Sequence, residues 1–229
     1  MFGFTRRSAP VLDPEQRFAL ATGAILTEMN GQRHDCLLGD EPSGSLKRSM
    51  RETLADYWGV ENREQLLEIL HWLSEEGHRA EYEALAEVLA KAHPIGDPLD
   101  LLSQEALAAM GPDEREVFRK QAAFIGEHGR KHPSILAWDL CRLVSVARFG
   151  AAAGYLSETE AWKWILDAAR VLNAAFGSWR ELGANYMAGR RYWAQEGNAE
   201  ASTAFERTYA ALVDERNEAS PWNRISWSG

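Results

Sequence analysis

Three charged residues interrupt the most apolar stretch of the chain, residues 134–156, and they are the first candidates for chemistry. They are Asp139, Arg142 and Arg148. The first two are spaced i, i+3 and can pair on one face of a helix. Arg148 lies about 180° around the same helix from Asp139 and therefore needs another partner. That partner could be a bound anion or one of the carboxylates that follow, Glu158, Glu160 and Glu181.

These charges admit two interpretations. A buried arginine without a partner is too costly to tolerate, so the three residues can form an internal ion-pair network that fixes the register of the helix. We favour this structural interpretation. The alternative is a pocket in which the planar guanidinium groups bind a phosphate or a carboxylate.

A second cluster places two arginines among aromatic residues: Arg190 and Arg191 with Tyr186, Tyr192 and Trp193. Arginine interleaved with aromatic rings can stack a base or hold a nucleotide by cation–π contact. The alternative is a packed face of Trp179, Tyr186 and Trp193 that the arginine stems cover. We favour packing for the aromatic residues, and both interpretations stay open for the two arginines.

Histidines supply the remaining candidates. His78 and Arg79 follow Gly77, where they can cap the carbonyls of the preceding helix, which we favour, or provide a proton donor in a pocket. His128 and His132 have the spacing of two metal ligands on one helical face. Gly129 and Pro133 disfavour a continuous helix there, and no third ligand has a suitable spacing, so we predict no metal site.

The usual catalytic signatures are absent from the sequence. It contains no G-x-x-x-x-G-K-[ST], G-x-G-x-x-G, H-E-x-x-H or G-x-S-x-G motif. We therefore assign no catalytic residue, predict no cofactor and favour a protein that is not an enzyme.

The elements that must position these residues are helices, because the apolar spacing is helical almost throughout. Asp13-Pro14 and Gly31 mark the start and end of a first helix. Ser45 is the predicted cap of a second helix, and Ser134 opens the longest apolar run. Capping-box patterns mark two further starts, Asn62 with Gln65 and Ser157 with Glu160, and Asn198 is the predicted cap of a last helix.

These patterns predict an all-α fold, a single compact multi-helix domain of about ten helices around a central buried helix at about 134–153. We divide the chain into an N-terminal arm (1–12), a helical domain (13–217) and a C-terminal tryptophan-containing strap (218–229). The strap can fold back over the domain, which we favour, or present its tryptophans to a partner.

Composition narrows the possible partners and compartments. The 229 residues include 25 Lys and Arg against 34 Asp and Glu, a net charge of −9. This acidic balance disfavours nucleic acid and anionic membranes as partners. Only two cysteines occur, Cys36 and Cys141, so a disulfide framework is excluded and a cytoplasmic location is expected. We identify no signal peptide and no membrane span.

Three spaced blocks resemble the bacterial domain of unknown function numbered 1266. The resemblance spans about Phe18 to Trp193 and implies a helical bacterial domain without an assigned activity. Some members of that family accompany chaperone-like or toxin-related loci, which points to protein partners. The blocks are Trp58-Gly59-Val60 with Arg63, Leu66-Leu67, Trp72-Leu73 and Gly77-His78-Arg79; Ala137-Trp138-Asp139 with Arg142, Arg148, Gly154-Tyr155 and Glu160-Ala161-Trp162; and Trp179, Tyr186, Gly189-Arg190 and Trp193, while Gly23-Ala24-Ile25-Leu26 and His34-Asp35 also fit.

We therefore predict a cytosolic all-α protein-interaction module, an accessory or immunity-type protein whose partner is another protein. The alternative is an enzyme or sensor that binds a small anionic or nucleotide-like ligand through an arginine and aromatic pocket. The candidate ligand-binding residues are His78, Arg79, Asp139, Arg142, Arg148, Glu160, Tyr186, Arg190, Arg191 and Trp193.

Overall fold

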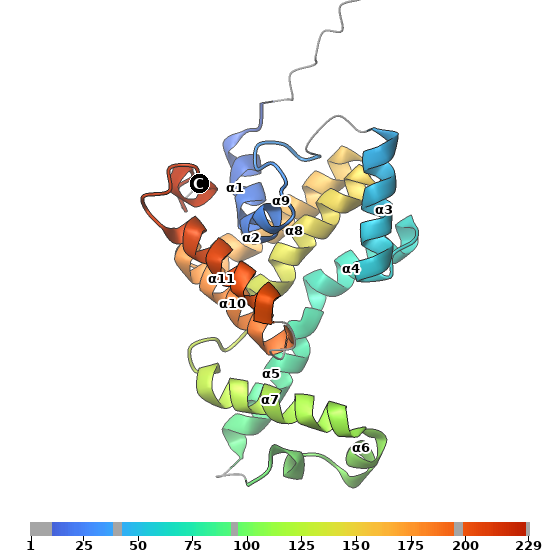
Figure 1. Cartoon of the computed structure of the whole chain (residues 1–229), viewed down its shortest axis with the longest axis vertical. Helices are drawn as coiled ribbons and strands as arrows, with labels where there is room; N and C mark the ends of the chain where they lie inside the picture. The colour runs from blue at the N-terminus through green and yellow to red at the C-terminus, as the bar shows by residue number, and fades with distance from the viewer. Residues whose placement is uncertain (1–10, 39–42, 93–95, 195–198, 228–229) are drawn as a thin grey trace, which may run out of the picture.

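The computed structural model describes residues 11–38, 43–92, 96–194 and 199–227, and every regular element in these ranges is helical. The predicted all-α fold is confirmed (Figure 1). The helices are α1 (Pro14–Thr22), α2 (Ala24–Met29), α3 (Gly44–Trp58), α4 (Arg63–Glu75), α5 (Gly77–Lys91), the 3₁₀ helix η1 (Pro98–Leu101), α6 (Gln104–Ala109), α7 (Pro112–His128), α8 (Leu136–Ala152), α9 (Glu158–Ala175), α10 (Trp179–Ala194), α11 (Ala199–Val213) and α12 (Pro221–Arg224).

Helix α8 is the centre of the fold, as predicted. It is buried over almost its whole length, and α3, α4, α9 and α10 pack around it. A helix that is apolar on all sides is stable only when neighbours cover every face. Ser134 does not cap it; instead the Asn185 side chain of α10 accepts the Ala137 N–H at 3.0 Å and donates to the Ser134 carbonyl at 2.7 Å.

The predicted first helix is divided into α1 and α2 at Gly23. A Cβ atom at this position would lie 3.0 Å from Val144 Cγ1, so the chain passes close to α8 at this break. Asp13 caps the start of α1 as predicted, and it also forms a capping box with Gln16. The next helix is capped by Ser43 rather than Ser45.

Two other predicted starts are confirmed. The Asn62 side chain accepts the Gln65 N–H at the start of α4, and Ser157 with Glu160 forms a capping box at the start of α9. The predicted cap Asn198 lies outside the described residues. Helix α7 extends to His128, and His132 follows in the connection to α8.

A lobe made of α5, η1, α6 and α7 projects from the main helical body (Figure 1). Helix α7 packs against α5 and η1, and α5 also contacts α8. The Tyr82 hydroxyl of α5 donates a hydrogen bond of 2.6 Å to the His132 carbonyl, which links the lobe to the segment before α8. The lobe is therefore attached to the body at two places, through α5 and through the segment between α7 and α8.

The C-terminal residues fold back over the body. Trp222 is 6% exposed and donates its indole N–H to the Ala21 carbonyl at 2.8 Å. It stacks on Trp179 with 5.8 Å between ring centroids, and the indole N–H of Trp227 donates to Phe176. Of the predicted N-terminal arm, residues 1–10 lie outside the described residues.

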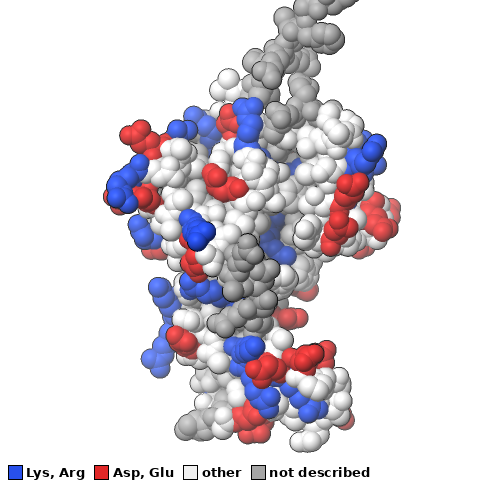
Figure 2. Space-filling view, in the orientation of Figure 1, with Lys and Arg blue, Asp and Glu red and all other residues white. Residues whose placement is uncertain are grey.

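Acidic and basic side chains are interspersed over the face of the molecule seen in Figure 2. None of the helices in the described ranges combines the length and apolarity needed to cross a membrane.

Candidate functional site

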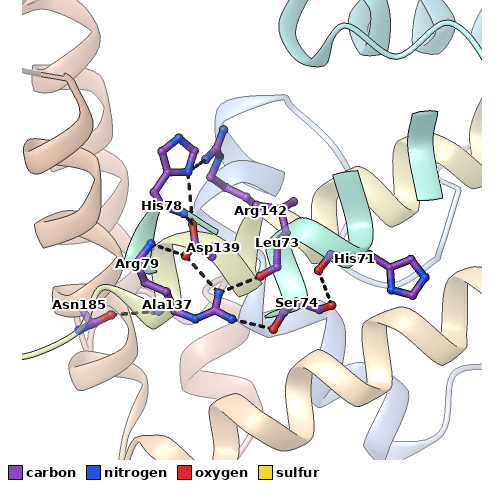
Figure 3. A network of polar contacts seen from close by, with 9 residues as sticks. All are labelled: His71, Leu73, Ser74, His78, Arg79, Ala137, Asp139, Arg142 and Asn185. Atoms are coloured by element: carbon purple, nitrogen blue, oxygen red, sulfur yellow. Dashed lines mark hydrogen bonds and ion pairs between the residues drawn. The ribbon is translucent and has the colours of Figure 1, made fainter. Parts of the chain in front are cut away.

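Asp139 joins α8 to the first turn of α5 (Figure 3). Its fully buried carboxylate accepts the backbone N–H groups of His78 and Arg79, both at 3.0 Å, and the Arg79 side chain at 3.2 Å. A carboxylate is stabilised at a helix N-terminus by unpaired amides and by the helix dipole. The predicted pair of Asp139 with Arg142 is wrong, since the structure records no salt bridge between them among the described residues.

Gly77 makes this contact possible. It has a φ of +59°, and a Cβ atom added there would lie 2.2 Å from Asp139 Oδ2. Arg79 also donates to the carbonyls of Leu73 at 2.9 Å and Ser74 at 2.7 Å, so it caps the end of α4 as predicted. His78, the other predicted cap, contacts Asp139 and Arg142 instead. Asp139, Gly77 and Arg79 thus fix the junction of α4, α5 and α8.

Arg142 lies one turn further along α8, with its guanidinium between two indoles. Its Cζ atom is 4.4 Å from the ring centroid of Trp58 and 4.5 Å from that of Trp138. Burial lowers the pKa of Arg142, an effect that Tyr186 and Asp139 oppose only in part. Arginine remains charged in proteins, so the group is a cation that has lost much of its hydration.

His78 is the polar neighbour of this cation. Its Nδ1 atom is 3.2 Å from Arg142 Nη1 and 3.4 Å from Asp139 Oδ1. Without a proton, Nδ1 accepts from Arg142; with a proton, it donates to Asp139. The His78 backbone N–H donates to Asp139 in either form, so His78 connects the fixed junction to the Arg142 cation when Nδ1 carries no proton.

We call Trp58, Trp138, Trp193 and His78 the tryptophan cage of Arg142. The four side chains come from α3, α8, α10 and α5, and the Trp193 centroid lies 6.0 Å from the Arg142 Cζ atom. Trp138 is 4% exposed, whereas Trp193 is 52% exposed, so the cage is closed on its inner side and reaches the surface at Trp193. Within the described residues, His78 is the only hydrogen-bond partner of Arg142.

Arg148 has a different environment from Arg142. Its side chain is buried and donates to the carbonyls of Leu37 at 3.1 Å, Arg33 at 2.8 Å and Cys36 at 3.2 Å, and to the Thr27 hydroxyl at 2.8 Å. Burial lowers the pKa of Arg148 to about 10. These contacts attach residues 33–37 to α8. The predicted carboxylate partners Glu158, Glu160 and Glu181 are wrong.

Glu160 lies apart from the cage. Its carboxylate pairs with Arg63 of α4 at 2.7 Å and accepts hydrogen bonds from Ser157 in its own capping box. These hydrogen bonds lower the pKa of Glu160 to about 2. Glu160 therefore connects α9 to α4 and stabilises the start of its own helix. Glu181 also has a local partner, because its carboxylate accepts the Gly177 N–H.

The second predicted cluster is divided between three environments. Arg191 is exposed and pairs with Glu206 of α11. The buried Tyr192 ring lies 4.9 Å from Tyr82. Arg190 is buried with its Cζ atom 4.4 Å from the Phe205 ring, and Tyr186 lies between Trp138 and Phe205 at centroid distances of 5.2 and 6.4 Å.

The structure therefore brings together His78, Arg79, Asp139, Arg142 and Trp193, with Tyr186 against Trp138, and places Arg148, Glu160 and Arg191 elsewhere. Sequence reasoning did not assign Trp58 or Trp138 to the site. The high tryptophan content was a general signal, with nine in the chain, but nothing in the spacing relates Trp58 to Arg142.

Comparison with known proteins gives a family match over most of the chain. The sequence profile described as "Protein of unknown function (DUF1266)" matches residues 53–227, a range that includes the whole tryptophan cage but begins after Gly23–Leu26 and His34–Asp35.

The chain is also similar to two proteins of Escherichia coli (strain K12). It is 29% identical over 166 residues to the uncharacterized protein YbeR, a match covering 70% of this chain and 66% of YbeR. It is 26% identical over 145 residues to the uncharacterized protein YbeU, covering 61% of this chain and 56% of YbeU. The match thus spans less than two thirds of either relative. No solved structure shows significant similarity.

Proposed function

The chain belongs to the DUF1266 family, and from its tryptophan cage we propose that it is a protein-recognition module that binds an acidic segment of a partner protein. The observation that carries this proposal is that Arg142 is held between Trp58 and Trp138 without a carboxylate partner among the described residues.

The charge balance around the cage supports an incoming carboxylate. The neighbouring acid, Asp139, is already held by two backbone N–H groups and by Arg79. Arg142 therefore retains donors for an external group. Arginine binds planar carboxylates through two parallel hydrogen bonds, and such bonds are stronger in a site that excludes water.

The composition of the cage favours a protein partner. Tryptophan and arginine are the residues that most often dominate binding energy at protein interfaces. Trp193 is half-exposed beside Arg142, where a partner's apolar side chain can cover it. The net charge of −9 opposes long-range attraction of an acidic partner, so recognition would depend on short-range contacts at the cage.

The proposal includes an accessory or immunity-type role in the bacterial cytoplasm. Both cysteines, Cys36 and Cys141, are buried thiols, which suits a reducing compartment. The family match and the bacterial relatives support a bacterial setting.

The test is affinity capture from a bacterial lysate, followed by calorimetry with the purified partner. Trp193→Ala should weaken binding by about 30-fold, the loss expected for a hot-spot residue worth about 2 kcal/mol. Tyr57→Ala is the matched control, because Tyr57 is 80% exposed on α3 and is not part of the cage. Circular dichroism confirms that both variants fold.

Equal binding by the wild type and by Trp193→Ala would refute the proposal. A thermal-shift screen against phosphates and nucleotides tests the alternative of a small anionic ligand at the same cage, since a ligand that binds only the native state raises the melting temperature. If a phosphate or nucleotide raises the melting temperature of the wild type but not of Arg142→Gln, the cage binds a small anion and not a protein partner.

A further inference from the structure

A groove of about 450 Å³ lies between α7, α10 and α11. These helices come together where the lobe meets the body (Figure 1). The volume of the groove is within the range of small-molecule sites, roughly 300–1,000 Å³. Apolar atoms contribute much of its lining, including Phe124 of α7 and Met187 of α10. Arg190 also lines it, and none of the contacts that define the tryptophan cage involves this residue.

Within the described part of the chain, Arg190 is a buried arginine that lacks a hydrogen-bonded counter-ion, which is unusual for a residue that lines a groove. The side chain is 7% exposed, and its Nε atom is fully buried without a hydrogen-bond partner. Among the described residues, the guanidinium makes one cation–π contact, in which its Cζ atom lies 4.4 Å from the Phe205 ring centroid. Burial lowers the pKa of Arg190. A buried charge without a hydrogen-bonded counter-ion is costly. An anion that reaches the Arg190 guanidinium from the groove would therefore be stabilised there.

The neighbouring cations of the groove already have carboxylate partners. Arg191 pairs with Glu206 at an Nε–Oε1 distance of 3.0 Å, and Lys120 lies 3.8 Å from Glu116. Glu127 also lines the groove, so the three cations are matched in number by the carboxylates of Glu116, Glu127 and Glu206. Arg190 is the cation of the described lining that has no carboxylate within salt-bridge distance, and an acidic group on a ligand can supply one.

We propose that this groove binds a small organic acid, with its carboxylate or phosphate on Arg190 and its apolar body against Phe124 and Met187. The planar guanidinium matches either acidic group through paired hydrogen bonds. The Phe124 and His128 rings, 4.6 Å apart, form one aromatic wall for the ligand body. This site is independent of the protein-recognition surface proposed above.

The test uses benzoate and phenyl phosphate as probes, with benzamide as the neutral control, and follows the Met187 methyl signal of the full chain by NMR. Both anions should shift this signal saturably, with a dissociation constant of about 1 mM, as expected for ligands of this size. Benzamide should leave it unchanged. The tighter of the two anions identifies the acidic group that the site prefers.

Arg190→Met should weaken binding of the better probe by at least about tenfold, because it removes the charge-assisted hydrogen bonds. The variant should melt at or above the wild-type temperature, because replacing an unpaired buried charge by an apolar chain removes its desolvation cost. Trp193→Ala, in the cage, should bind the probes as the wild type does. Arg190→Lys serves if the methionine variant does not fold, and should bind less tightly because it lacks the paired donors.

Three results would overturn the proposal: equal binding of benzamide, no saturable shift of the Met187 signal with either anion, or unchanged binding by a folded Arg190 variant. Partner binding that Trp193→Ala leaves unchanged, together with probe binding that an Arg190 variant weakens, would refute only the protein-recognition proposal.

Discussion

Replacing Gly77 by alanine tests the junction that supports the cage. The backbone at Gly77 has a φ of +59°, and the new Cβ atom would lie 2.2 Å from Asp139 Oδ2 and 2.3 Å from its Cγ. These distances are far inside van der Waals contact. The carboxylate must therefore move away from the start of α5, and it then loses the backbone N–H groups of His78 and Arg79.

The expected cost has two parts. A left-handed conformation costs alanine about 1–2 kcal/mol. Loss of two hydrogen bonds to a charged group costs about 1.5–3 kcal/mol each. With partial relaxation, we expect Gly77→Ala to lower the free energy of unfolding by about 4–6 kcal/mol, a large share of the 5–15 kcal/mol typical of folded domains.

Gly59→Ala is the matched control. Gly59 has a φ of +64°, but no heavy atom lies within 4 Å of the Cβ atom that would be added. This variant should lose only the conformational part, about 1–2 kcal/mol. Urea denaturation followed by tryptophan fluorescence and circular dichroism measures both, and an unchanged m-value shows that the difference is one of stability.

A second background separates the clash from the backbone strain. In an Asp139→Ala protein, Gly77→Ala should cost little more than Gly59→Ala, because the carboxylate is no longer present to clash. If the two glycine variants of the wild-type chain agree within about 0.5 kcal/mol, the limit of ordinary additivity, Asp139 does not hold the start of α5.

Two further predictions concern charged residues outside the cage. Arg148→Met leaves the carbonyls of residues 33, 36 and 37 without their donor, so it should cost at least about 3 kcal/mol and accelerate hydrogen exchange in this segment; unchanged protection there would contradict the role of Arg148. Hydrogen bonds from Arg63 and Ser157 lower the pKa of Glu160 to about 2 from its ordinary value of 4.5, so the stability it contributes is present above about pH 4.5 and is lost as the pH falls towards 2. Measured by urea denaturation, the free energy of unfolding of Glu160→Gln should fall less than that of the wild type between about pH 4.5 and 2. An identical pH dependence in both proteins would show that the Arg63 pair does not stabilise the fold.

The parts of the fold that were predictable from sequence are those with local signals. The capping interactions at Asn62 and Ser157 involve residues three positions apart, so they are visible in the sequence itself. The burial of α8 follows from apolar residues on every side of one helix. The close approach of Gly23 to Val144 was not predictable, because the two residues are distant in sequence.

The polar partners in the core could not be predicted for a related reason. Asp139 binds backbone amides 60 and 61 positions away, and Arg148 binds carbonyls 111 to 115 positions away. Every residue has a carbonyl and nearly every residue has an amide, so such partners leave no trace in residue type. A sequence search for the counter-ions of Arg148 considers carboxylates and therefore selects the wrong residues.

Arg142, Arg148 and Arg190 show why burial alone is a poor guide to function. A guanidinium has five N–H donors and a positive charge, and what it can bind depends on how many donors its own chain leaves unused. Arg148 makes four hydrogen bonds, so its donors are almost fully used in holding a loop. Arg142 makes one, to His78, and Arg190 has only the Phe205 ring among the described residues. The capacity to bind an external anion therefore increases from Arg148 to Arg142 to Arg190, the reverse of the order in which these residues hold the fold together.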